Sequence, residues 1–175
     1  MIRKAALAIL ALGLAAQTAG AATAFANLYL ATPDGRGAAV GSAIFDDSGS
    51  GARIRLSLHT LPPGQHGFHV HDKGNCDPNV KDGQPVAAGA AGGHYDPNLT
   101  GKHQGPEGMG HMGDLPVLTV AADGSDSEIL VAPRIRDVRA LHGHALMIHA
   151  GGDNYADAPA PLGGGGPRIA CGLIQ

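Results

Sequence analysis

A short segment with two histidines two residues apart places the strongest constraint on the fold of this chain. The segment runs Gly67-Phe68-His69-Val70-His71. Side chains alternate between the two faces of a β-strand, so His69 and His71 project to one side while Phe68 and Val70 project to the other. Imidazole is a good ligand for copper and zinc. The segment therefore predicts a strand with one face toward a metal site and the other toward a core.

The composition favours an all-β fold around this strand. The 175 residues fit one domain, and 28 glycines and 12 prolines imply many turns and loops. Alternation is clearest over residues 52–61, and similar segments recur at intervals of roughly ten residues, as in a sandwich or barrel. We expect about eight strands. They lie near residues 26–31, 38–45, 52–61, 67–71, 115–121, 129–132, 145–150 and 168–174.

Two long segments lack this alternation. Residues 73–113 and 151–167 are rich in glycine and proline, and the first contains three histidines. A loop of this length in a compact domain is usually functional or disordered. A bound metal can supply the order that apolar packing does not, so we expect both loops to be functional.

The first residues have the pattern of a secretory signal peptide. Arg3 and Lys4 form a positive start, and residues 5–16 are an apolar run that is short for a membrane span. Residues 19–21 fit a cleavage site, with alternatives a few residues further on. We expect residues 1–21 to be a signal peptide and residues 22–175 to be the mature domain, without a membrane segment. The alternative is an uncleaved anchor or a buried N-terminal helix.

Export would place the two cysteines in an oxidising compartment. Cys76 and Cys171 are the only pair, so they can form one intramolecular disulfide. In the chain-entropy model a crosslink over this span stabilises the fold by roughly 4–5 kcal/mol, and measured values are often lower. The alternative is two buried free thiols. The formal net charge of −3 excludes a broad basic face for nucleic acid.

One set of ligand-type residues lies in or at the end of the first long loop. It consists of His94, His103, His111 and Asp114. Three imidazoles and a carboxylate can make a closed tetrahedral zinc site, which would hold the loop in place.

A second set lies on the expected strands. His69, His71 and His149 offer three nitrogens, and a shared fourth nitrogen would suit Cu(II). His94 directly follows Gly93, where the backbone can approach closely. It could offer one ring nitrogen to each metal, although spacing alone does not show that such a bridge exists.

Six short segments of this chain form a recognisable series. They are GFHVH (67–71), GGHYDP (92–97), KHQGP (102–106), GHMGDLP (110–116), HAGGDN (149–154) and PRIACG (167–172). Together they resemble copper/zinc superoxide dismutases of the exported bacterial type, occur in the family order and cover nearly all of the expected mature chain. Residues 77–81 and 104–110 differ in length or content from such relatives.

The resemblance implies a fold, an activity and cofactors. The implied fold is an eight-stranded antiparallel Greek-key β-barrel or sandwich. The implied activity is enzymatic dismutation of superoxide to dioxygen and hydrogen peroxide. A redox-cycling copper would be bridged to a structural zinc by a histidine imidazolate, with one copper and one zinc ion per subunit. The implied location is the periplasm, and both a monomer and a homodimer stay open.

The resemblance also implies roles for individual residues. Arg168 and His94 correspond to the catalytic arginine and the bridging histidine, and Asp153 to the carboxylate that links His69 to His103. Cys76 and Cys171 match the intrasubunit disulfide of the family. The implied copper ligands are His69, His71, His94 and His149, and the implied zinc ligands are His94, His103, His111 and Asp114.

Superoxide is an anion, whereas the chain is acidic. Screening over about 8 Å hides most distant carboxylates, so Arg168 and the metal charge would dominate the local field. Superoxide dismutase is itself the standard example of such steering. Lys81 or Lys102 would add to the attraction.

Two other classes of function are alternatives. An exported copper/zinc-binding protein without turnover usually lacks a copper ligand or the arginine, and both are present here. A zinc hydrolase needs an open zinc site with a general base, and none is apparent in the sequence.

The remaining histidines fall outside the ligand pattern, and we expect structural or surface positions for them. They are His59, His66, His142 and His144.

Overall fold

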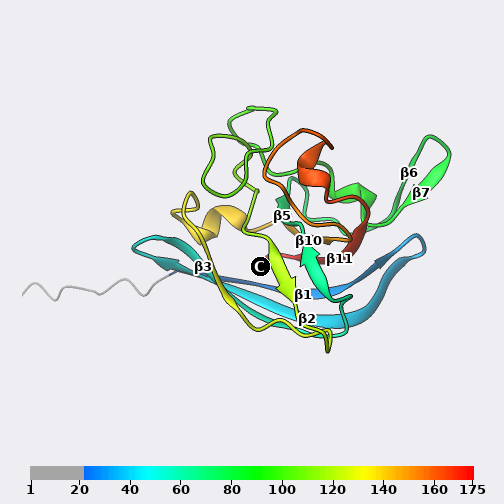
Figure 1. Ribbon diagram of the computed structural model, residues 1–175, viewed down its shortest axis with the longest axis horizontal. Helices are drawn as coiled ribbons and strands as arrows, with labels where there is room; N and C mark the ends of the chain where they lie inside the picture. Colours follow the sequence, from blue (N-terminus) through cyan, green and yellow to red (C-terminus); the bar gives the residue numbers. More distant parts are fainter. Residues whose placement is uncertain (1–21) are drawn as a thin grey trace, which may run out of the picture.

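The alternating segments form a seven-stranded antiparallel sheet in the computed structural model, which describes residues 22–175 (Figure 1). The spatial order is β5-β10-β11-β1-β2-β3-β9. The expected signal peptide lies outside the described residues. The strands are β1 (Thr23–Thr32), β2 (Gly35–Ser48), β3 (Gly51–Leu58), β5 (Phe68–His71), β9 (Ile129–Ala132), β10 (Ala145–His149) and β11 (Arg168–Leu173).

Smaller elements complete the fold. Strands β4 (Gly64–His66) and β8 (Leu118–Val120) form a separate antiparallel pair. Between residues 22 and 175, no helix is long and apolar enough to cross a membrane. The 3-10 helices are η1 (Gly89–Ala91), η2 (Val138–Leu141) and η3 (Leu162–Gly164).

Strand β3 shows how the sequence builds the core. Ile54, Leu56 and Leu58 are buried, while the intervening Arg53 and Arg55 face solvent. Burying a side chain of this size stabilises the fold by about 1.5–3 kcal/mol. The period of two therefore fixes which face of the sheet lines the core.

Several neighbouring strands are distant in sequence, since β5 pairs with β10 and β11 pairs with β1. This arrangement confirms the all-β antiparallel expectation. The strand expected over residues 67–71 is β5 in the structure. It is preceded by β4, and Gly67 separates the two strands. Strand β4 pairs with β8, whereas β5 pairs with β10.

The first long loop contains a hairpin that our strand prediction missed. Strands β6 (Asn79–Lys81) and β7 (Gln84–Val86) pair antiparallel. Asp82 and Gly83 turn the chain between them with left-handed φ values of 53° and 76°. Asp-Gly is a strong hairpin signal, so the sequence contained the information.

Both long loops lie on the same side of the molecule in Figure 1, next to β5 and β10. A disulfide between Cys76 and Cys171 joins the first loop to β11, with the Cα atoms 5.8 Å apart. The predicted disulfide is thus confirmed.

Candidate metal centre

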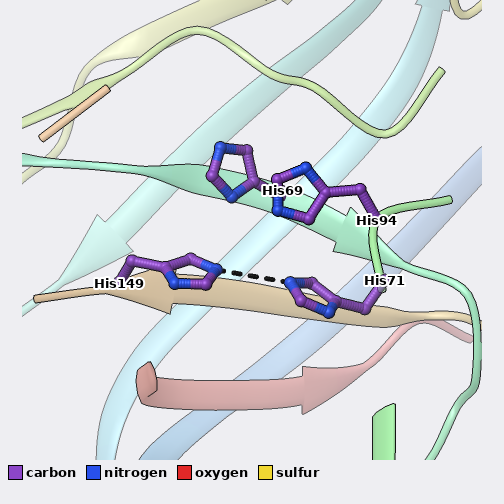
Figure 2. A group of neighbouring side chains, drawn as sticks. All are labelled: His69, His71, His94 and His149. Carbon is purple, nitrogen blue, oxygen red and sulfur yellow. Dashed lines mark hydrogen bonds between the residues drawn. The ribbon is translucent and has the colours of Figure 1, made fainter. Parts of the chain in front are cut away.

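Four histidine rings converge where β5 and β10 pair. His69 lies opposite Met147 and His71 opposite Ala145, which brings their rings toward His149 at the end of β10. His94 comes from the first loop, where His94 and His71 form an isolated bridge. Figure 2 shows the four rings gathered around a common point. All four residues are buried, and they offer nitrogens within 4.8 Å of one another.

Hydrogen bonds at the outer nitrogens fix the orientation of these rings. His71 Nδ1 donates to the Gly92 carbonyl and His149 Nδ1 to the Gly166 carbonyl, each at 3.0 Å. His69 Nε2 donates to Asp153 Oδ2 at 2.7 Å. Such contacts set the tautomer and leave the other nitrogen with a lone pair.

The inner nitrogens fit a cation. His71 Nε2 and His149 Nε2 lie 3.3 Å apart, joined by the dashed line in Figure 2, and their outer nitrogens already carry the ring protons. His69 Nδ1 and His94 Nε2 are buried without any hydrogen-bond partner. Buried lone pairs that face one another are stabilised by a shared positive charge. Nitrogen donors of this kind suit copper.

A second set adjoins the first and is centred on a carboxylate. Asp114 Oδ1 lies 2.9 Å from His94 Nδ1, 3.0 Å from His103 Nδ1 and 3.3 Å from His111 Nδ1. His103 Nδ1 is buried, and its contact with Asp114 does not have hydrogen-bond geometry. Three imidazoles and a carboxylate fit a closed zinc site. His94 therefore presents one nitrogen to each set.

Asp153 links the two sets. Its Oδ1 accepts from His103 Nε2 and its Oδ2 from His69 Nε2, both at 2.7 Å. Gly163 packs directly against this bridge with a φ of 70°. A Cβ at Gly163 would lie 2.0 Å from Asp153 Oδ1 and 2.8 Å from His103 Nε2. Only glycine fits there, and the sequence analysis gave no reason to single it out.

Burial makes the four-histidine set a group of neutral rings. It lowers the pKa of His69 to about 3 and that of His149 to about 4. Burial, and then the proximity of His94, also lowers the pKa of His71 well below its ordinary value. At neutral pH these rings need not lose a proton before they bind a cation.

Carboxylates dominate the second set instead. Burial by itself would lower the pKa of His103, but the adjacent carboxylates of Asp114 and Asp153 outweigh it and raise that pKa to about 9. Burial by itself would raise the pKa of Asp114, yet contacts with His103 and His94 hold it well below its usual range. In the metal-free protein, a proton on His103 thus partly balances the negative charge that a bound cation would balance.

Arg168 lies beside the four-histidine set at the start of β11. Its guanidinium donates to the carbonyls of Ala88 and Gly92. The Gly92 carbonyl also accepts from His71, so one carbonyl holds both side chains. Arg168 and Lys81 line the same cavity of about 310 Å³.

The other histidines belong to neither set. His66 is buried, with Nδ1 2.7 Å from the His149 carbonyl and Nε2 2.8 Å from the Pro62 carbonyl. His59 and His142 are exposed. Within residues 22–175, none of these histidines joins a group with metal-binding geometry.

A curled antiparallel fold that carries a four-histidine set beside a three-histidine and carboxylate set defines a two-metal β-barrel protein. The sequence model of the copper/zinc superoxide dismutase family matches residues 39–174. The chain belongs to this family.

Individual relatives are similar over most of their length. Superoxide dismutase [Cu-Zn] 2 of Salmonella typhimurium is 52% identical over 93% of this chain and 94% of its own. The structure of Cu/Zn superoxide dismutase from Brucella abortus matches with a TM-score of 0.87 and 49% identity, over 88% of this chain and all of that one. The solution structure of the monomeric enzyme from Salmonella enterica matches with a TM-score of 0.79 and 52% identity, with the same coverage.

Proposed function

We propose that this protein is a superoxide dismutase, which converts two superoxide anions and two protons into dioxygen and hydrogen peroxide. One observation carries the proposal. His94 directs Nε2 to the four-histidine set and Nδ1 to Asp114 in the second set, which couples a site suited to copper to a site suited to zinc. Membership in the copper/zinc superoxide dismutase family supports the same reaction.

We further propose which residues hold the metals. His69, His71, His94 and His149 would hold copper, while His94, His103, His111 and Asp114 would hold zinc. When bound, copper supplies the one-electron redox couple for both half-reactions, and zinc supplies a fixed positive charge. Asp153 orients one ligand of each metal through His69 and His103.

Arg168 binds the anionic substrate in this proposal. Two carbonyl contacts fix its guanidinium beside the four-histidine set, where the Gly92 carbonyl also accepts from His71. The screening length in physiological salt is about 8 Å, so this nearby charge outweighs distant carboxylates. Lys81 lines the same cavity and adds to the attraction, whereas Lys102 is not among the residues that line it.

His94 supplies a proton. Asp114 contacts its Nδ1 at 2.9 Å, which leaves Nε2 as the nitrogen that gains and releases a proton during turnover. Burial lowers the pKa of His94 in the metal-free protein, so burial favours release of this proton.

We propose that residues 1–21 direct export to the periplasm and are then removed. The charged start, the apolar run and the disulfide support this location. Mass spectrometry of protein purified from the periplasm locates the new N-terminus, and a full-length chain retained in the membrane would contradict the proposal. The homodimer expected as an alternative stays a prediction, which light scattering of the mature protein tests.

The enzyme is tested with mature protein loaded with copper and zinc. We expect fast dismutation that is lost in His149→Ala and kept in His142→Ala, a matched change at an exposed histidine. No activity at full metal occupancy would contradict the enzyme and favour a metal-binding protein without turnover.

A further inference from the structure

His111 is the least supported ring of the second set. Its Nδ1 lies 3.3 Å from Asp114 Oδ1, the longest of the three ring contacts. The outer nitrogen of His103 is held by Asp153, but Nε2 of His111 has no hydrogen-bond partner among the described residues. Metal-binding histidines are usually oriented through that second nitrogen. Among the described residues, only the long contact with Asp114 and the backbone of His111 itself set the direction of this ring.

The backbone around His111 is held closely. His111 N donates to the Lys102 carbonyl at 2.9 Å. A Cβ on Gly110 would lie 2.2 Å from the same carbonyl oxygen, so the two loop segments touch at this point.

Arg134 supplies the remaining support from outside the loop. It lies two residues after β9, and its guanidinium donates to the His111 carbonyl at 3.1 Å and to the Gly110 carbonyl at 2.9 Å. Hydrogen bonds from a charged donor are roughly twice as strong as neutral ones. The two bonds join the end of β9 to the turn that carries His111.

No other contact explains the charge on Arg134. In the part of the chain that the structure describes, no carboxylate lies within ion-pair distance of it. The side chain is partly buried and lines a cavity of about 130 Å³ with Tyr95, Met112 and Ile135. Its guanidinium is thus hydrogen-bonded to two carbonyls of the first long loop, those of Gly110 and His111.

We propose that Arg134 is a positioning residue for the zinc site. By fixing the carbonyls of Gly110 and His111, it directs His111 Nδ1 toward Asp114. This role rests on the zinc ligands proposed above. It differs from them because Arg134 touches no metal and acts only through the backbone of one ligand.

The test compares Arg134→Met with Arg136→Met. Methionine keeps much of the side-chain volume but donates no hydrogen bond. Arg136 is an exposed neighbour that lines the same cavity, and its one side-chain hydrogen bond to the described residues is a 3.4 Å contact with the Gly49 carbonyl. Zinc affinity of the metal-free protein is measured by competition with a chromophoric chelator. Cobalt(II) bound in place of zinc reports ligand geometry by its visible absorption.

We expect Arg134→Met to weaken zinc binding about 10-fold. It should also change the cobalt spectrum at saturation, which a general loss of stability would not do. Arg134→Lys should recover part of the affinity because lysine can donate to one of the two carbonyls, and Arg136→Met should match the wild type. Wild-type affinity and spectrum in Arg134→Met, or an equal loss in Arg136→Met, would overturn the proposal.

His111→Ala separates this proposal from the proposed function. If His111→Ala leaves zinc affinity unchanged, the zinc ligand set is wrong and the role of Arg134 is overturned with it. If His111→Ala weakens zinc binding while Arg134→Met does not, the zinc set stands and only the positioning role fails. Should Arg134→Met not fold, the cobalt spectrum and zinc affinity of Arg134→Lys decide between the same outcomes.

Discussion

The two halves of the metal centre are built on different scaffolds. Three of the four proposed copper ligands lie on β5 and β10, whose hydrogen bonds hold the backbone in place. Three of the four proposed zinc ligands lie in the first long loop, and Asp114 lies where that loop ends. Strands can therefore preform the proposed copper site, whereas the proposed zinc site would depend on carboxylates, on Arg134 and on the ion.

The two sets of side chains also differ in charge. The copper rings have lowered pKa values because they are buried, and hydrogen bonds to backbone carbonyls hold two of them. The zinc rings surround an ionised Asp114, and the pKa of His103 is raised to about 9. The proposed copper site thus consists of neutral donors, and the proposed zinc site carries negative charge that a cation must balance.

Asp114→Asn should cause the largest difference between zinc binding and copper binding. It removes the charge that faces three rings, so zinc affinity should fall by more than the roughly 100-fold seen for outer partners of metal ligands. The four-histidine set should still bind copper. Titration with each metal, followed by elemental analysis, measures both. Asp123→Asn, at an exposed turn, is the control, and an equal loss of copper would contradict the separation of the sites.

Arg168→Ala should impair the copper side alone. We expect the dismutation rate at low salt to drop by about 10-fold or more, with weaker dependence on ionic strength, because the nearest fixed positive charge is lost. Copper should remain bound. Arg139→Ala changes an exposed arginine paired with Asp137 and serves as the control. An unchanged rate at low salt would contradict the role of Arg168.

Acid and alkali should destabilise the metal-free protein through different halves of the site. The pKa values of His69 and His149 are lowered to about 3 and 4. Their contribution to the free energy of unfolding is therefore present above about pH 6.5 and is lost as pH falls toward 4. The pKa of His103 is raised to about 9, so its contribution is present below about pH 6.5 and lost as pH rises through 9.

Urea unfolding at pH 5, 7 and 9.5 measures this effect, which should be of the order of 1–3 kcal/mol per ring. His103→Gln should remove the alkaline loss and leave the acid loss intact. The same alkaline loss in both proteins would show that the charge on His103 does not stabilise the fold.

Lys81→Gln should have the smallest effect. Lys81 is exposed in the cavity that Arg168 lines, and screening by salt limits its pull on superoxide. We expect a rate loss of a few-fold at low salt that vanishes at high salt. Stopped-flow kinetics measures it, with Lys102→Gln as the comparison. A larger loss of rate in Lys102→Gln would mean that the substrate approaches past Lys102 and not through the cavity lined by Lys81.

The difference in scaffolds also explains how far the sequence could predict the structure. Alternation around His69 and His71 predicted a strand with ligands on one face, because a period of two depends only on local geometry. The Asp82-Gly83 turn was equally local and was overlooked. The contacts of Gly92, Gly163 and Arg134 join segments far apart in the chain. They use backbone carbonyls or close approach, which no residue pattern reveals before the fold is known.

The sharing of His94 between the two sites is the central claim. It can be measured directly by calorimetry of copper(II) binding to the zinc-loaded protein at pH 7, in buffers of different ionisation enthalpy. The other copper rings are neutral at this pH, so any proton released must come from His94 Nε2. We predict about one proton per copper ion. Binding of copper at full occupancy with no proton released would contradict the shared ring.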